Sequence, residues 1–193
     1  AGRDLLAVDD LVLTRPGQPR GSGSWLDVYD ADGMLGRFVE TAPSELAHAG
    51  VVRLDDVLGA PVLAVVLPGA GGRARVDGPN GPCGFVSRVG RVRANLELHR
   101  AGPAPNGDPL AVLRPLADGA GWAWTDGGAV LARLRWWRLS EPTAGAHGEA
   151  RYLLRVGASV DRSLRPLLLA LPVLVDRVVV QVPQRAERGA AGH

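Results

Sequence analysis

The sequence predicts a mainly β protein, a closed antiparallel barrel of about twelve strands around a hydrophobic C-terminal central helix. Two observations predict this fold. Short alternations of apolar and polar residues recur between turn residues along most of the chain, and residues 163–182 form one long apolar stretch. A helix that is apolar on every side must be surrounded by protein or lipid, and an antiparallel meander leaves unpaired edges unless it closes. A barrel closed around that helix meets both requirements.

The strands are predicted as hairpins spaced roughly every 22 to 26 residues. In residues 26–39, apolar and polar positions alternate on both sides of the turn Asp30-Ala-Asp-Gly33, as is typical of a hairpin. Comparable hairpins are predicted at 51–66, 74–86, 93–114 and 122–134, with a first strand near 5–14 and a last strand near 151–156. The 26 Gly and 15 Pro supply the turns that such a sheet needs.

The apolar stretch carries signals for the start and the end of a helix. Asp161 or Ser163 is placed to cap the first turn, and Pro166 near that turn lacks only an amide that would be unpaired anyway. Pro172 is expected to kink the helix or end it. The β-branched residues 178–180 are then expected to continue as an extended segment.

Length and composition fit one domain that does not bind nucleic acid. The chain has 193 residues, and we expect a single domain over 1–193 with a core at about 5–182 and a flexible tail at 183–193. All 22 basic residues are Arg, a bias that we attribute to a GC-rich genome. Because the net charge is only +2, a polyanion is not an expected partner.

The cysteine count and the hydropathy pattern bear on location. Cys83 is the one cysteine, so no internal disulfide forms and the cytoplasm is the expected location. The first residues hold no apolar run of signal-peptide length. Residues 167–175 provide nine uncharged positions, well below the roughly 20 that span a bilayer. We therefore predict no transmembrane segment, and we expect neither a cofactor nor a metal.

Several segments of the sequence resemble those of one known protein family. The chain resembles the phospholipid scramblase and LURP-one-related family in five features. They are the hairpins with an Asp-x-x-Gly turn, the strand Tyr152-Leu-Leu-Arg155, Asp161, the segment Leu164-Arg-Pro-Leu-Leu-Leu-Ala-Leu171 and Asp176. That family belongs to the tubby-like superfamily. The resemblance is to a bacterial member and covers about residues 5–182. It implies a twelve-stranded barrel threaded by a hydrophobic C-terminal helix.

The resemblance implies less about function. The superfamily includes phosphoinositide-binding tubby domains, scramblases and many bacterial members of unknown role. This chain lacks the Cys cluster that animal scramblases use for palmitoylation, and it has no Lys-Arg constellation that maps onto the tubby phosphoinositide pocket. No lipid-binding residue is therefore carried over.

The strongest candidate surface site is the run Arg133-Leu-Arg-Trp-Trp-Arg138. Trp prefers membrane interfaces and Arg pairs with lipid phosphates, so the run combines both chemistries. Strand alternation offers a second interpretation, in which Arg133 and Arg135 face solvent while Leu134 and Trp136 pack inward against the central helix. The candidate ligand-binding or lipid-binding residues are Arg133, Arg135, Trp136, Trp137 and Arg138.

Other constellations are weaker. The turn Asp30-Ala-Asp32-Gly33 fails the register of a calcium loop, and Gly69-Ala-Gly-Gly72 is not followed by the Lys-Ser or Lys-Thr of a phosphate loop. For catalysis the candidates are Cys83, His48, His99 and His147, which no sequence motif joins.

Three functions follow from these observations. The first is a cytoplasmic, non-enzymatic binding domain that engages an anionic membrane surface peripherally, or a small apolar ligand, at the barrel rim. The second is an enzyme of a specialised-metabolite pathway, with a rim pocket shaped by the loops at 101–109 and 140–150. The third is a structural or regulatory protein-interaction domain. The oligomeric state is not predicted.

Overall fold

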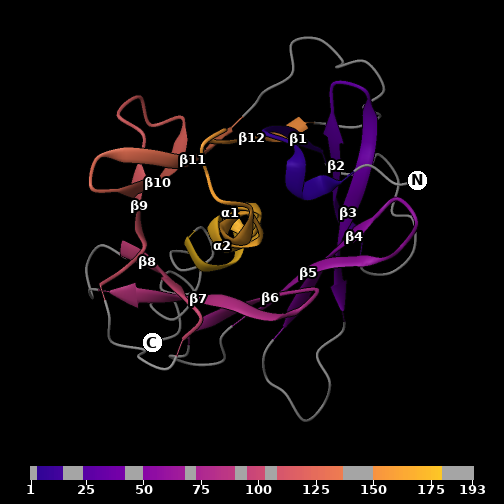
Figure 1. The fold of residues 1–193 in the computed structure, drawn as a ribbon. Helices are drawn as coiled ribbons and strands as arrows, with labels where there is room; N and C mark the ends of the chain where they lie inside the picture. The colour runs from indigo at the N-terminus through magenta and orange to yellow at the C-terminus, as the bar shows by residue number, and fades with distance from the viewer. Residues whose placement is uncertain are drawn as a thin grey trace, which may run out of the picture.

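The computed structural model of the protein describes residues 4–14, 24–41, 50–67, 73–89, 95–102, 108–136 and 150–179. Its twelve antiparallel strands each pair with the next in sequence, and the last strand returns to pair with the first, so the sheet closes (Figure 1). The predicted fold class is confirmed. The strands are β1 (Asp10–Thr14), β2 (Ser24–Asp30), β3 (Gly33–Thr41), β4 (Val51–Asp56), β5 (Pro61–Val66), β6 (Ala74–Gly78), β7 (Gly81–Val89), β8 (Asn95–Arg100), β9 (Ala111–Pro115), β10 (Gly121–Asp126), β11 (Ala129–Trp136) and β12 (Ala150–Val156).

The five predicted hairpins all form, and the start of the first strand is corrected. Residues 5–9 do not extend β1, because a 3-10 turn, η1 (Leu5–Ala7), precedes the strand. The side chain of Asp4 caps that turn by accepting a hydrogen bond from the amide of Leu6 at 3.0 Å. A capping side chain satisfies an amide that a strand would have paired, so the turn competes successfully with the sheet.

The wall strands alternate between core and outer face. In β8, Leu96 and Leu98 are buried in the core cluster, while the residues between and after them are only partly buried. The same period of two runs through β4, where Val52 and Leu54 point inward. The interior of the barrel is therefore an apolar surface on every side, and it faces the C-terminal helix.

The helix lies on the barrel axis (Figure 1) and runs as η2 (Arg162–Leu164), α1 (Arg165–Leu169), α2 (Leu171–Leu174) and the π-helical turn η3 (Val175–Val179). Every residue from Leu167 to Val175 is buried. At β7 the wall approaches the helix closely, because a Cβ on Gly84 would lie only 2.9 Å from Leu167 Cδ2. The helix thus fills a space that the side chains of twelve strands alone do not fill.

Pro172 interrupts the helix as the sequence predicts, but the chain does not become extended afterwards. Pro172 has no amide to donate to the preceding turn, and α1 gives way to α2 at Ala170. Val178 and Val179 lie in η3, so the expectation of an extended segment is wrong for them. The helical ladder resumes because the amide of Leu174 donates to the carbonyl of Ala170 at 3.1 Å. Residues 180–193, which include the predicted tail, lie outside the described residues.

Arg165 and Asp176 mark the two ends of the buried helix. Arg165 donates to Asp9 Oδ1 at 2.6 Å and to the carbonyl of Val8 at 3.2 Å. Asp176 accepts a hydrogen bond from the hydroxyl of Tyr152, on β12, at 3.1 Å. Buried charges need such partners, and these contacts tie both helix ends to the wall. In the described part of the chain, no helix is long and apolar enough to cross a bilayer.

Candidate functional site

Strand β11 carries the described part of the candidate run. Arg133 and Arg135 are exposed on the outer face, and Leu134 between them is fully buried against the core. This arrangement follows from strand alternation. Trp137 and Arg138 lie outside the described residues.

Trp136 ends β11 at the barrel rim, with 39% of its surface exposed. Its ring meets Trp122 of β10 edge-on, with centroids 5.5 Å apart, and Tyr152 of β12 at 4.9 Å. We call these three residues the aromatic rim. Rings in direct contact leave no space for a ligand between them, so the aromatic rim is not a cage, and Trp136 is its exposed member. Tyr152 links it to the helix end through Asp176.

Arg135 is compensated by a local acid. Its guanidinium donates to Asp118, which lies in the turn between β9 and β10. Both side chains are about half exposed, with 49% and 51% of their surface accessible. An ion pair this exposed contributes little stability, but it does occupy the charge of Arg135.

Arg133 belongs to a row of outward positions that the register brings together. Ala123 of β10 pairs with Arg114 of β9 on one side and with Arg133 on the other. Arg133 in turn pairs with Arg155 of β12. We call the four residues Arg114, Ala123, Arg133 and Arg155 the arginine belt. Like charges directly opposite each other on neighbouring strands are destabilising, so this belt is not explained by sheet stability.

Only one arginine of the belt has an acidic partner among the residues that the structure describes. Arg155 donates through Nε to Asp10 Oδ1 at 2.5 Å, and this hydrogen bond raises the pKa of Arg155 above its ordinary value. Neither Arg114 nor Arg133 forms an ion pair within the described ranges. Both side chains are exposed, so within the described part of the chain these two positive charges have no acidic partner.

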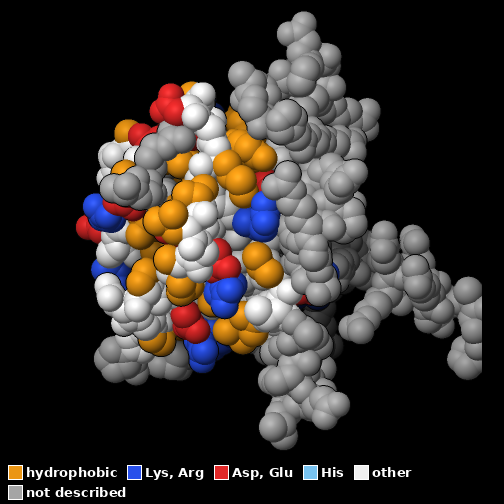
Figure 2. Space-filling view, turned by 90° about the vertical axis from the view of Figure 1, so that its right-hand side faces the viewer, with side chains coloured by type: hydrophobic (Ala, Val, Ile, Leu, Met, Phe, Trp, Pro, Cys, Tyr) orange, Lys and Arg blue, Asp and Glu red, His pale blue; other side chains and the backbone are white. Residues whose placement is uncertain are grey.

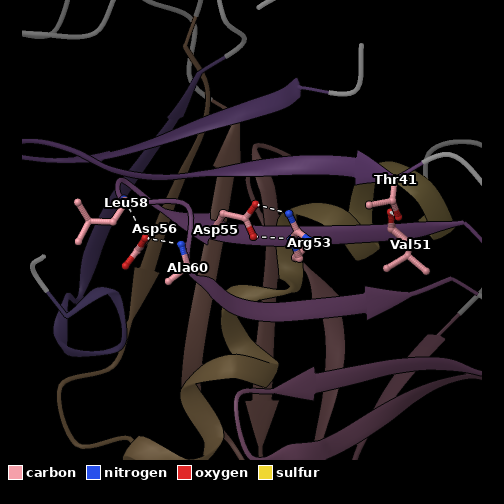
Figure 3. A network of polar contacts seen from close by, with 7 residues as sticks. All are labelled: Thr41, Val51, Arg53, Asp55, Asp56, Leu58 and Ala60. Atoms are coloured by element: carbon pink, nitrogen blue, oxygen red, sulfur yellow. Dashed lines mark hydrogen bonds and ion pairs between the residues drawn. The ribbon is translucent and has the colours of Figure 1, made fainter. Parts of the chain in front are cut away.

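The opposite side of the barrel is built differently. Three arginines there each contact a carboxylate: Arg37–Asp27 at 2.6 Å, Arg53–Asp55 at 2.6 Å and Arg75–Asp77 at 2.9 Å. We call these six residues the paired face. Figure 2 looks onto the side of the barrel that carries β2–β4 and shows blue side chains beside red ones. Figure 3 shows the two parallel hydrogen bonds from Arg53 to Asp55.

The arginines at 73, 75, 91 and 93 do not extend the arginine belt in the described part of the chain. Arg75 belongs to the paired face, and the guanidinium of Arg73 lies over the ring of Phe85, 4.8 Å from its centroid. Positions 91 and 93 lie outside the described residues.

Near the paired face, the turn between β4 and β5 exposes an aliphatic side chain on a backbone that hydrogen bonds hold in place. Asp56 Oδ1 accepts from the amides of Leu58 and Ala60, both at 2.8 Å (Figure 3). Leu58 itself is 76% exposed. A single exposed Leu is normal on a protein surface, and nothing in the described residues identifies what would cover it.

His99 lies in a polar cluster on the outer face of β7 and β8. Its ring stacks on Phe85 with centroids 4.8 Å apart, and Nε2 is 3.1 Å from Ser87 Oγ and 3.5 Å from Glu97 Oε2. In a Ser-His-acid triad the hydroxyl and the carboxylate contact different ring nitrogens. Here both approach Nε2, so the cluster lacks the geometry of a triad.

Cys83 shows no sign of activation either. Burial raises the pKa of its thiol, and its sulfur is 3.8 Å from the carbonyl of Gly81. A raised pKa reduces the thiolate that acts as nucleophile. His48 and His147 lie outside the described residues. Within the described ranges, no three His, Cys, Asp or Glu side chains are grouped to hold a metal ion.

Sequence reasoning missed Arg114 and Arg155 as neighbours of Arg133. The three arginines are far apart in the chain, and their alignment depends on how strand lengths and bulges set the register. One bulge lies between Trp124 and Thr125, beside the belt. The sequence contains the i, i+2 spacing of Arg133 and Arg135. This spacing shows that the two residues share a face of one strand, but it does not show which residues of the neighbouring strands pair with them.

Comparison with known proteins supports the architecture and no function. The chain is similar in structure to an Arabidopsis thaliana protein, AT5G01750, with a TM-score of 0.57 and 16% sequence identity. The match covers 88% of this chain and 91% of that one. At this identity the similarity shows a shared fold alone. No family model matches the chain, and no curated protein matches it.

Proposed function

We propose that the protein is a non-catalytic binding domain that docks peripherally on an anionic lipid surface through the β11 side of the barrel. The observation that carries this proposal is the exposed, uncompensated Arg133 on the strand that ends at the half-exposed Trp136. Arginine pairs with lipid phosphates, and Trp prefers the level of the headgroups. The paired face offers no comparable free charge, so the proposal assigns one side of the barrel to the membrane.

Two further statements belong to this proposal. We assign the protein to the phospholipid scramblase and LURP-one-related family within the tubby-like superfamily, supported by the sequence phrases and by the closed barrel around a buried helix. We place it in the cytoplasm, at the inner membrane surface, where anionic lipids attract basic patches.

Co-sedimentation with vesicles tests the function. Wild-type protein is expected to sediment with phosphatidylcholine vesicles that contain phosphatidylserine, and not with pure phosphatidylcholine. Arg133→Gln and Trp136→Leu should each reduce the bound fraction, and added NaCl should reduce it further because exposed charges are screened. Arg75→Gln is the matched control, since it removes the same charge from the paired face.

Two results would refute a lipid-docking role. One is equal sedimentation of the wild type with neutral and anionic vesicles. The other is equal loss of binding in Arg75→Gln and Arg133→Gln, which would indicate a response to net charge without a specific surface. Circular dichroism of each variant confirms that the barrel is folded.

A further inference from the structure

We propose that Arg114 and Arg133 together form a binding site for a phosphate monoester, centred over Ala123 on the outer face of the barrel. The inference rests on the proposed function and deepens it, because it extends the site beyond β11 and names the chemical group that it binds. It also predicts a role for Arg114, which lies on a different strand from the candidate run.

The register places the two arginines at a suitable separation. Arg114 and Arg133 both pair with Ala123, from opposite sides. Because neighbouring strands lie about 4.8 Å apart, the two backbones are about 10 Å apart. An arginine side chain is long enough for both guanidinium groups to reach a ligand above the short Ala123, while a larger residue at that position would stand between them.

The burial of Ala123 supports this arrangement. Ala123 lies between two inward-facing tryptophans, so its side chain points outward, and it is absent from the core cluster. It is nevertheless only 4% exposed. The described side chains in register beside it are those of Arg114 and Arg133, and arginine stems commonly cover apolar surface. The two residues therefore flank one point of the surface.

The positive charges of Arg114 and Arg133 favour an anion with more than two acceptor oxygens. On the paired face one carboxylate satisfies one arginine, as Asp55 does by accepting from Arg53 Nε at 2.6 Å and Nη2 at 2.8 Å. Two guanidinium groups that both reach a ligand above Ala123 present two such forks. A phosphate monoester has three terminal oxygens and a charge near −2, so it accepts from both forks at once. Arg155 pairs with Arg133 on the other side, but its charge is compensated by Asp10.

Titration with inorganic phosphate and with glycerol 3-phosphate, followed by calorimetry, tests the site directly. Arg114→Gln and Arg133→Gln should each weaken binding by about tenfold or more, as expected for a charge-assisted hydrogen bond. Ala123→Leu should weaken binding without a change of charge. Arg75→Gln is the control and should change the affinity less than about twofold. No saturable binding of either compound by the wild type, or equal weakening in Arg75→Gln, would overturn the proposal.

Vesicles distinguish a lipid headgroup from a soluble phosphate ester. If the site binds a lipid, vesicles with phosphatidic acid, a phosphate monoester, should bind the wild type more tightly than vesicles with phosphatidylserine, and Arg114→Gln should abolish that difference. Saturable binding of glycerol 3-phosphate with no preference for phosphatidic acid would identify a soluble ester.

The outcomes also separate the two proposals. Vesicle binding that depends on Arg133 and Trp136 but not on Arg114 would overturn the phosphate site and leave the docking function standing. Phosphate binding that depends on both arginines, together with no vesicle binding, would overturn the docking function and leave the phosphate site standing.

Discussion

On the side of the barrel that carries β2–β4 and β6, each of the three arginines Arg37, Arg53 and Arg75 contacts an aspartate. On the side that carries β9–β12, Arg114 and Arg133 lie in register without an acidic partner among the described residues, and Arg133 faces another arginine. The two sides have the same strand geometry and cover the same helix (Figure 1). The difference therefore lies in the outer side chains: among the described residues, these three arginines have a carboxylate partner, whereas Arg114 and Arg133 have none.

The largest expected effect tests how tightly the backbone is packed on the side of the barrel that carries β9–β12. Gly121 of β10 lies in the wall beside the arginine belt, and a Cβ there would come within 2.0 Å of the carbonyl oxygen of Leu134. Gly121→Ala should lower the free energy of unfolding by about 2–3 kcal/mol, because overpacking forces the strands apart. Urea denaturation measures this change. An unchanged free energy of unfolding would show that the sheet around the arginine belt is loosely packed.

The next effect compares the two sides directly. Asp27 and Arg37 are 8% and 25% exposed at their side chains, so Arg37→Ala leaves a mostly buried carboxylate without its partner. We expect a loss of about 2 kcal/mol in the free energy of unfolding. Arg133→Ala should change it by less than about 0.5 kcal/mol, since it removes a like-charge neighbour of Arg155. Equal losses in the two variants would remove the distinction between the sides.

A smaller effect is expected on the inner surface of the arginine side. Tyr152→Phe removes the hydroxyl that donates to Asp176 at 3.1 Å and keeps the ring that packs on Trp136. Because the carboxylate is buried, we expect a loss of about 1–2 kcal/mol in the free energy of unfolding. Phosphate binding should not change. A loss of phosphate affinity in this variant would show that the helix end and the outer site are coupled.

The smallest effect concerns a residue that belongs to neither side. Asp161 caps η2 by accepting from the amide of Ser163 at 2.7 Å. Hydrogen bonding from the side chain of Ser163, and next from its backbone, lowers the pKa of Asp161 below its ordinary value of 3.8. A lowered pKa in the folded state means that the stabilisation is complete above about pH 3.8 and is lost as the pH falls through the folded-state value. Asp161→Ala should lower Tm slightly at neutral pH.

The pH dependence of that difference is the decisive measurement. The gap in Tm between the wild type and Asp161→Ala should narrow in acid, while Asp161→Asn, which keeps an acceptor oxygen, should show a smaller gap at neutral pH. A gap that stays constant with pH would contradict a contribution from the ionised carboxylate.

The barrel could be predicted from the sequence because its signals are local and repeated. The alternation in residues 26–39 identifies the hairpin of β2 and β3, and the apolar run 167–175 identifies the buried helix. The exceptions have local causes as well. Asp4 caps a turn where the apolar Leu5 and Leu6 suggested a strand, and the helical ladder continues beyond Pro172 despite the β-branched residues that follow.

The arrangement of the candidate site could be predicted only in part. The exposure of Arg133 and Arg135 follows from the period of one strand, which the sequence contains. The pairing of Arg133 with Arg155, and the position of Arg114 across Ala123, depend on the stagger between strands. Bulges such as the one between Trp124 and Thr125 change that stagger by one residue, and no residue pattern within a single strand encodes it.

The ladder that closes the barrel has a consequence for how the chain folds. Asp10 of β1 and Arg155 of β12 are 145 residues apart in sequence, and they form neighbours in the closed sheet. Strands β1–β11 are therefore synthesised before β12, and the helix that fills the interior is synthesised later still. Such distant pairing slows folding, and an open sheet edge is prone to aggregation until it is paired. Closure of the barrel thus waits for residues 150–179, which hold β12 and the helix.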